Sequence, residues 1–197
     1  KRFIFSSSSA VYGDCKSFPT SEDSRLDPAS PYGLHKVMGE QYCALFEKIY
    51  DLETFSLRYF NVFGERQPLS GPYSLVMGIF ANQLLNELPL TINGDGEQRR
   101  DFVYVGDVID ANLACMTKKH SNDNIFNIGS GFNISVNELA DMLNKTAPRI
   151  NNPPLIEARQ TLADISKAKK LLNWNPKIQL SDWIKIYKKG LGLLLKS

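Results

Sequence analysis

Short apolar runs alternate along the chain with longer segments in which apolar residues recur every three or four positions. The short runs predict strands at about 2–5, 54–60, 90–92, 101–105 and 124–128. The longer segments predict helices at about 32–50, 74–87, 107–116, 135–145, 165–172 and 181–194. Strands that alternate with helices in this way are typical of an α/β fold built on a parallel sheet.

Local sequence signals refine these elements. Ser30 followed by Pro31 suits the N-cap and first position of the helix at 32–50. Ser135 with Glu138 three residues later predicts a capping box. Four serines at 6–9 follow the first strand, and we expect them to form a small-residue loop. Segment 61–73 contains glycines and prolines but no periodic pattern, and long loops of this kind are often functional.

The composition is that of a globular domain and argues against several classes of function. Of the 197 residues, 43% are hydrophobic and 22% are charged, and the net charge of +2 gives no reason to expect a nucleic-acid partner. No apolar run reaches the length of a membrane span, so we expect no membrane insertion. The cysteines and histidines are scattered, which predicts neither a disulfide framework nor a metal site and suits a reducing, cytoplasmic setting.

Candidate chemistry lies near the N-terminus. Tyr32 and Lys36 are four residues apart in the expected helix, so they share one face about one turn apart. A lysine ammonium beside a phenol favours the phenolate, which can act as a general base near neutral pH. The serines at 6–9 lie at the carboxyl end of a strand, where open α/β sheets bind ligands. Taken singly, the Tyr–Lys spacing also fits a surface helix and the serines also fit a plain loop; the combination is more specific.

Seven segments carry a further pattern. They are SSSSAVYG (6–13), SPYGLHK (30–36), LRYFNVFG (57–64), GDG with RDF (94–96 and 100–102), VGDV (105–108), NIG (127–129) and ADISKA (163–168). In this order they resemble the extended short-chain dehydrogenases/reductases of the NAD-dependent epimerase/dehydratase family, specifically its nucleotide-sugar 4-epimerases. The resemblance covers the chain from Phe3 to about Pro176.

The resemblance implies an α/β fold: the C-terminal part of a Rossmann-type doubly wound parallel sheet plus a smaller α/β substrate-binding lobe. Residues 1–62 would belong to the NAD-binding domain. Residues 63–197 would form mainly the nucleotide-sugar-binding lobe, with about 101–128 returning to the sheet. Members of the family often dimerise through a helix bundle, so the helix at 32–50 would contribute to a homodimer.

The resemblance also implies a redox-neutral inversion at C4 of a UDP-hexose. In the family a tyrosine takes the proton of the 4-hydroxyl while NAD accepts the C4 hydride; the 4-keto sugar then turns over and the hydride returns to its other face. Tyr32 matches the base, Lys36 its partner and nicotinamide-ribose ligand, and Ser8 the catalytic serine, with Ser9 as the alternative. The positions that flank the nicotinamide match Phe60 and Val62.

The family's sites for the UDP-sugar substrate can be carried over as well. Arg100 matches a phosphate-binding arginine, whose guanidinium fork suits a pyrophosphate, and Asn61 matches an asparagine that contacts the sugar diphosphate. Weaker matches around the nucleotide are Gln67, Val76 and Asn93. Related dehydratases place an Asp-Glu pair just after the catalytic serine or threonine, and decarboxylases usually keep the glutamate. This chain has Ser9 and Ala10 there, which favours an epimerase.

The sequence departs from the family pattern near its C-terminus. Where relatives usually carry Arg-x-Gly-Asp, this chain has PLIE at 154–157. Glu157 can replace the aspartate that binds the ribose, but the arginine is missing, and Arg159 is a candidate replacement. Thr161 falls where a bulky residue restricts the family to unacetylated sugars. We therefore expect UDP-GlcNAc and UDP-GalNAc to fit as well as UDP-Glc and UDP-Gal.

The dinucleotide fingerprint, a Gly-x-x-Gly-x-x-Gly turn after the first strand, is absent from these 197 residues. In the family it belongs to roughly a hundred residues that we expect before Phe3. Two interpretations follow: the C-terminal part of a complete epimerase, or a non-enzymatic remnant that retains sugar-nucleotide contacts. Under either interpretation the NAD site is incomplete, and we expect no catalysis by these residues alone.

Overall fold

The buried side chains form two clusters, each at the centre of one lobe. The computed structural model describes residues 1–71, 74–119, 123–155 and 157–192. One cluster contains residues of a three-stranded parallel sheet, and the other contains residues of the helices of the second lobe.

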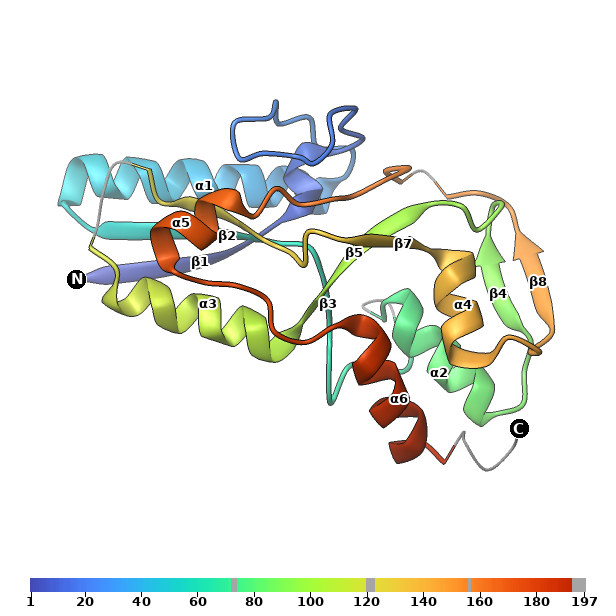
Figure 1. The fold of residues 1–197 in the computed structure, drawn as a ribbon. Helices are drawn as coiled ribbons and strands as arrows, with labels where there is room; N and C mark the ends of the chain where they lie inside the picture. Colours follow the sequence, from blue (N-terminus) through green and yellow to red (C-terminus); the bar gives the residue numbers. More distant parts are fainter. Residues whose placement is uncertain (72–73, 120–122, 156, 193–197) are drawn as a thin grey trace.

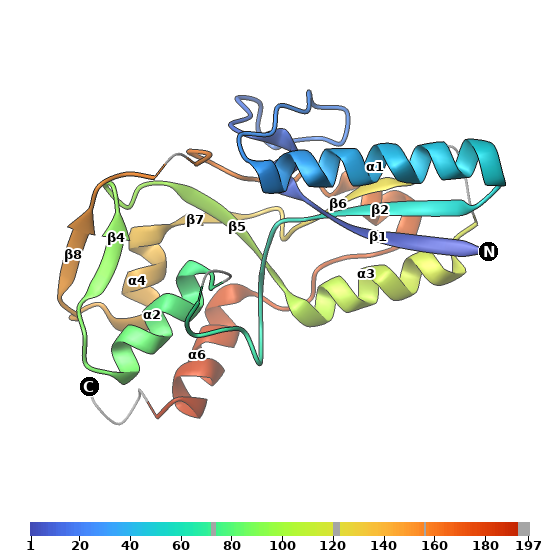
Figure 2. The same cartoon turned by 180° about the vertical axis from the view of Figure 1, so that it is seen from behind.

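The first lobe is built on strands in the order β1–β2–β6. They are β1 (Arg2–Ser8), β2 (Glu53–Tyr59) and β6 (Ile125–Ile128). Helices α1 (Pro31–Tyr50) and α3 (Val105–Thr117) lie on opposite sides of these strands (Figures 1 and 2), and α5 (Ser166–Leu172) packs against β6. Residues 54–58 of the central strand are all buried, because both faces of β2 are covered.

The second lobe consists of helices beside a pair of short parallel strands. Its elements are α2 (Val76–Leu85), β4 (Leu90–Asn93), α4 (Val136–Asn144), β8 (Arg149–Asn152) and α6 (Leu180–Gly190). A small mixed sheet of β3 (Asn61–Phe63), β5 (Arg99–Tyr104) and β7 (Asn133–Ser135), in the order β3–β5–β7, extends between the lobes (Figure 1). The end of β5 leads directly into α3, so this sheet connects the two cores.

Both expected helix caps are confirmed. Ser30 Oγ accepts a hydrogen bond from the Gly33 backbone N–H at 3.1 Å, with Pro31 as the first residue of α1. At α4, Ser135 Oγ accepts from the Glu138 N–H at 3.0 Å, and the Glu138 carboxylate accepts from the Ser135 N–H at 2.6 Å. These side chains satisfy backbone donors that the first turn of a helix leaves unpaired.

The expected loop at 6–9 was wrong. Ser6, Ser7 and Ser8 continue β1 and pair in parallel with residues 57–59 of β2, and Ser9 begins a short 3₁₀ helix, η1 (Ser9–Tyr12). Pairing with β2 outweighs the low intrinsic strand preference of these residues. As a result, the serines are held rigidly at the end of the sheet.

Other differences concern short strands. The segment expected to be a patternless loop at 61–73 contains β3, while residues 72–73 of it lie outside the described residues. Strands β7 and β8, of three and four residues, were not predicted. Pairing partners distant in sequence create such strands, so local periodicity does not reveal them. Buried residues between Ala163 and Trp174 belong to the first cluster. The chain therefore returns to the first lobe a second time, outside the range of 101–128 that was expected to return.

Candidate active site

A cavity of about 710 Å³ opens where the carboxyl ends of β1 and β2 face the second lobe. It is lined by Ser7, Ser8, Ser9, Ala10, Gly13, Ala29, Ser30, Tyr32, Tyr59, Phe60, Asn61, Val62, Ser74, Leu75, Arg100, Glu157, Ala158 and Thr161. Most of the candidate residues from the sequence are in this set. The position matches the general rule that open parallel sheets bind ligands at the carboxyl ends of their strands.

The first turn of α1 lies unusually close to η1, and this brings Tyr32 and Ser8 to one wall of the cavity. A Cβ added to Gly33 would come within 2.5 Å of the Ala10 carbonyl oxygen. Only glycine therefore allows this approach at the residue that follows Tyr32. Ser8 Oγ accepts a hydrogen bond from the Ala10 N–H at 3.1 Å, which caps η1 and fixes the direction of the side chain.

Tyr32 and Lys36 lie together as the spacing predicted. The Lys36 ammonium is 5.5 Å from the centre of the Tyr32 ring and donates a hydrogen bond to the Ser6 carbonyl oxygen at 2.8 Å. Lys36 thereby joins α1 to the end of β1. Tyr32 is 55% exposed, and its hydroxyl makes no hydrogen bond to any described residue.

A buried polar network stands behind these residues. The Glu40 carboxylate accepts from Ser7 Oγ at 2.5 Å and pairs with Arg58 at 2.7 Å, and both charged side chains are at most 5% exposed. Arg58 also donates to the Tyr12 hydroxyl, which donates to Asn127 Oδ1. Burial raises the pKa of the Tyr12 phenol to about 12, so Tyr12 is not a base at neutral pH.

Sequence reasoning assigned no role to this network. Glu40 is one turn beyond Lys36 on α1, and Arg58 interrupts the apolar run of a central strand. Those two facts are the signal that could have revealed it, because a charge in a buried strand needs a buried partner. The network ties α1 to the ends of β1 and β2.

Phe60, Asn61 and Val62, which continue from β2 into β3, form one continuous segment of the cavity wall. Phe60 is 5% exposed and, with Val62, provides an apolar wall. Asn61 Nδ2 donates to the Asp101 carbonyl oxygen at 3.0 Å and to Thr161 Oγ1 at 3.4 Å. Thr161 Oγ1 also accepts from the Asp101 N–H at 3.1 Å. Thr161 is therefore a small side chain held against the cavity wall.

Asp101, which the sequence reasoning did not select, organises the loops beneath the cavity. Its carboxylate is fully buried and accepts hydrogen bonds from the N–H groups of Ser130, Gly131 and Ala163 and from Ser130 Oγ. Burial raises the pKa of the Asp101 carboxyl, while these hydrogen bonds act to lower it. Asp101 thus joins segments that are distant in sequence.

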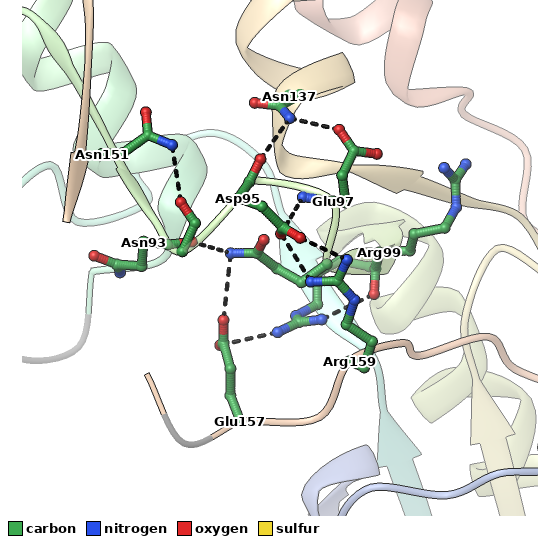
Figure 3. A network of polar contacts seen from close by, with 11 residues as sticks. Asn93, Asp95, Glu97, Arg99, Asn137, Asn151, Glu157 and Arg159 are labelled. Atoms are coloured by element: carbon green, nitrogen blue, oxygen red, sulfur yellow. Dashed lines mark hydrogen bonds and ion pairs between the residues drawn. The ribbon is translucent and has the colours of Figure 1, made fainter. Parts of the chain in front are cut away.

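Arg100 and Glu157 form an ion pair in the cavity wall. Arg100 Nη2 lies 2.9 Å from Glu157 Oε2, and Arg100 Nη1 donates to the Arg99 carbonyl oxygen at 2.9 Å. Gln98 Nε2 donates to the Asn93 carbonyl oxygen at 3.0 Å and reaches Glu157 Oε1 at 3.5 Å (Figure 3). The candidate phosphate ligand and the candidate ribose ligand are therefore in contact with each other.

Arg159 does not join this pair. Its guanidinium makes two parallel hydrogen bonds to the Asp95 carboxylate, at 2.8 and 2.9 Å (Figure 3). This pairing holds the pKa of the Asp95 carboxyl at about 2. Arg159 and Asn93 line a neighbouring cavity of about 250 Å³ instead of the large one.

The remaining candidates are more distant. Gln67 and Val76 are not among the residues that line the large cavity, and Val76 packs against the core of the second lobe. Ser74 does line it but was missed, because it lay at the expected start of a helix. The buried atoms Ser74 Oγ and Gln67 Nε2 have no hydrogen-bond partner among the described residues. Such unpartnered groups are often completed by a ligand or water.

The donor set fits one end of a dinucleotide. The Lys36 ammonium and the Tyr32 hydroxyl suit the hydroxyls of a nicotinamide ribose, and the apolar wall of Phe60 and Val62 suits a nicotinamide ring. The glycine-rich turn that cradles a dinucleotide pyrophosphate is not in this sequence. The fit therefore concerns the nicotinamide end of NAD.

Among the described residues, no helix is long and apolar enough to cross a membrane. The same residues contain no group of three or more His, Cys, Asp and Glu side chains placed to hold a metal ion.

Comparison with known proteins gives close matches. A putative UDP-glucose 4-epimerase of Methanocaldococcus jannaschii is 41% identical over 190 residues, which are 93% of this chain and 61% of that protein. The crystal structure of a UDP-glucose 4-epimerase from Thermotoga maritima with UDP-glucose is similar at a TM-score of 0.90 and 38% identity, covering 97% of this chain and 64% of that chain. The crystal structure of a UDP-glucuronic acid 4-epimerase from Bacillus cereus, in complex with UDP-glucuronic acid and NAD, is similar at a TM-score of 0.85 and 36% identity. The match covers 98% of this chain and 62% of that chain.

The fold is thus that of the Rossmann-type α/β epimerases. The family model for the NAD dependent epimerase/dehydratase family matches residues 1–129, and the chain belongs to this family. NAD is the cofactor of the family. The chain spans 57% to 61% of the length of three of the curated relatives it matches.

Proposed function

We propose that the protein is an NAD-dependent 4-epimerase that interconverts UDP-hexoses through a 4-keto intermediate. The observation that carries this proposal is the single cavity lined by Ser8, Tyr32 and Arg100, with Lys36 beside the tyrosine. A base and a hydroxyl donor lie at one part of its wall and an arginine at another. A UDP-sugar has the matching groups, a sugar hydroxyl and a diphosphate.

In this proposal Tyr32 removes the proton of the sugar 4-hydroxyl and later returns it. Ser8, fixed at the start of η1, hydrogen-bonds to the same oxygen, with Ser9 as the alternative. Lys36, whose ammonium lies 5.5 Å from the centre of the Tyr32 ring, holds the nicotinamide ribose. When bound, NAD supplies a reversible hydride acceptor beside C4.

The substrate's nucleotide end lies toward the second lobe. Arg100 binds the diphosphate through its guanidinium. Asn61 and the unpartnered hydroxyl of Ser74 line the same cavity and provide further contacts to the substrate. Thr161 leaves room for an N-acetyl group, which extends the substrate range to UDP-GlcNAc and UDP-GalNAc.

The dehydratase and decarboxylase alternatives lack support at the residues that follow Ser8. Elimination of water needs a proton donor and a base at C5, and Ser9 and Ala10 provide no carboxylate there. A second candidate function is binding of UDP-sugars without turnover by these 197 residues alone. Two observations favour this second function. The residues proposed to bind the substrate line the cavity, and the sequence has no glycine-rich dinucleotide turn.

The protein also offers a surface for self-association. One side of α1 exposes large apolar side chains at Leu34, Met38, Tyr42, Leu45, Phe46 and Ile49. Contiguous exposed apolar surface of this kind marks interaction sites. We include a homodimer through α1 in the proposal.

Product analysis tests the proposed reaction. The full-length gene product is incubated with NAD and UDP-glucose or UDP-GlcNAc, and the products are identified by NMR. The expected products are UDP-galactose and UDP-GalNAc. A 4-keto-6-deoxy sugar would instead make the protein a dehydratase and overturn the proposal. Calorimetric titration of the 197-residue chain with UDP tests the second candidate function.

A further inference from the structure

The charges in the wall of the large cavity cancel. Among the described residues that line it, Arg100 carries the positive charge and Glu157 the negative charge, and they are paired at 2.9 Å. The Arg100 side chain is 11% exposed, so its charge is largely shielded from water, while Glu157 is 39% exposed. A phosphate that approaches Arg100 therefore meets a guanidinium already paired with a carboxylate.

The position of Glu157 is supported by its neighbours. Gln98 is buried, and its side-chain amide holds the Asn93 carbonyl oxygen on one side and reaches the Glu157 carboxylate on the other (Figure 3). Glu157 thus accepts from two donors, one charged and one neutral. Because Glu157 belongs to the same chain, it stays close to Arg100 at a high effective concentration.

No second cation relieves this competition within the described part of the cavity wall. The nearby guanidinium of Arg159 is committed to Asp95 and faces the neighbouring cavity (Figure 3). Arg100 is therefore the only cation among the described lining residues, and an acidic residue of the same wall is paired with it.

We propose that Glu157 is an internal competitor for Arg100 and sets the affinity of the site for nucleoside diphosphates. The diphosphate must displace the carboxylate from the guanidinium, and the two negative groups then lie near each other. The carboxylate thus lowers affinity for the charged part of the ligand. In this inference the partner of Glu157 is Arg100 and not the ribose, the contact expected from the sequence, so binding of the nucleoside part is unaffected. The inference rests on the proposed function, because a nucleoside diphosphate is the assumed ligand.

The test uses isothermal titration of the full-length protein with UDP and with uridine. Glu157→Gln keeps the size of the side chain and removes its charge. We expect it to bind UDP about five- to twentyfold more tightly than wild type, because the phosphates no longer have to displace a carboxylate from the Arg100 guanidinium. Binding of uridine should change less than twofold.

Two further variants isolate the cause. Glu97→Gln removes a nearby carboxylate that contacts Asn137 instead of Arg100, and it should leave both affinities within twofold. In an Arg100→Gln background, Glu157→Gln should no longer tighten UDP binding, because there is nothing left to compete for.

The outcomes separate the two proposals. Weaker UDP binding by Glu157→Gln would make Glu157 a ligand group and overturn the inference. The inference would also fail if Glu157→Gln raised the affinities for UDP and uridine equally. It would fail as well if Glu157→Gln still raised the affinity for UDP in the Arg100→Gln background. If wild type and every variant fail to bind UDP, the proposed function fails and the inference with it.

Discussion

At the level of single side chains, the polar groups around the cavity divide into those held by protein partners and those open to a ligand. Asn61, Thr161 and Asp101 hydrogen-bond to one another's side chains or backbone and give the wall its shape. The Tyr32 hydroxyl and Ser74 Oγ have no partner among the described residues. The open groups are available to a ligand as they stand, whereas Ser8 and Arg100, which the proposed function also uses, already have protein partners.

Thr161 tests how that space selects the sugar. Replacing it with tyrosine adds a ring at the position expected to meet an N-acetyl group. We expect Thr161→Tyr to lower turnover of UDP-GlcNAc relative to UDP-glucose by about tenfold or more. The ratio of kcat/KM for the two substrates is the measurement, since a general loss of activity cancels. Thr161→Ser, which keeps the hydroxyl and the space, serves as control, and an unchanged ratio in Thr161→Tyr would contradict the assignment.

The Arg159–Asp95 pair makes a prediction about pH. The pKa of the Asp95 carboxyl is about 2, below its ordinary value of 3.8, because Arg159 donates two hydrogen bonds to it. The contribution of the pair to stability is therefore fully present above about pH 4 and is lost as the pH falls through 2. In Arg159→Gln, the pKa of Asp95 should return toward 3.8.

NMR titration of the Asp95 carboxyl carbon measures this shift. Arg149→Gln is the matched control, because Arg149 pairs with Asp141 and does not touch Asp95. An unchanged Asp95 titration in Arg159→Gln would mean that the pair is not formed in solution.

At the level of elements, α1 is the part that assembles the site. Its first turn carries Tyr32, its second carries Lys36, and its third carries Glu40, which holds the ends of β1 and β2 through Ser7 and Arg58. Breaking a buried pair such as Glu40–Arg58 leaves an uncompensated charge, which is strongly destabilising. The orientation of the helix therefore depends on contacts along its whole inner face.

Gly33 tests the close approach of α1 to η1. A methyl group there meets the Ala10 carbonyl, which is backbone and cannot move aside easily. We expect Gly33→Ala to lower the free energy of unfolding by about 1–3 kcal/mol and to reduce kcat as Tyr32 moves away from Ser8. Chemical denaturation measures the first effect and initial rates the second.

Gly190→Ala is the control, because a methyl group at that helical position meets nothing within 4 Å. Stability unchanged in Gly33→Ala would show that α1 and η1 are further apart than described.

The sequence predicted the long helices and strands and many of the residues that line the cavity. It did not predict the short strands or the contacts between side chains from different elements. Helix starts at Ser30 and Ser135 and the Tyr32–Lys36 pair could be predicted because their causes are local: a cap or a four-residue spacing. Strands β3, β7 and β8 could not, because they exist only through pairing with distant segments. The same reason explains the missed roles of Glu40 and Arg58, whose partners come from other elements. The pairing of Glu157 with Arg100 could not be predicted either, since only the fold brings the two side chains together.

At the level of the whole molecule, the cavity exists because two lobes meet. In the first lobe, β1 supplies Ser8 and helix α1 supplies Tyr32, while the small sheet between the lobes supplies Asn61 and Arg100. In the proposed function, the first lobe would hold the reacting sugar and Arg100 of the small sheet would bind the diphosphate. The outer side of α1, with its exposed apolar residues, lies apart from both functions and is available for a second copy of the protein.

The mass of the protein in solution tests the dimer. Met38 and Tyr42 are exposed and one turn apart on α1. We expect Met38→Glu combined with Tyr42→Glu to halve the mass measured by light scattering, because two charges would be buried at the interface. Gln41→Glu, an exposed polar position on the same helix, should leave the mass unchanged. A wild-type protein that is monomeric at all concentrations would contradict the proposed interface.

The rate of UDP-glucose to UDP-galactose conversion by the full-length protein with NAD, compared between wild type and Tyr32→Phe, tests the proposed catalysis most sharply. Phenylalanine keeps the ring and removes the hydroxyl that takes the proton. We expect wild type to interconvert the two sugars and Tyr32→Phe to be slower by about a hundredfold or more, with UDP affinity unchanged. Equal rates in the two proteins, or no conversion by wild type, would contradict the assignment of this cavity as the active site of a 4-epimerase.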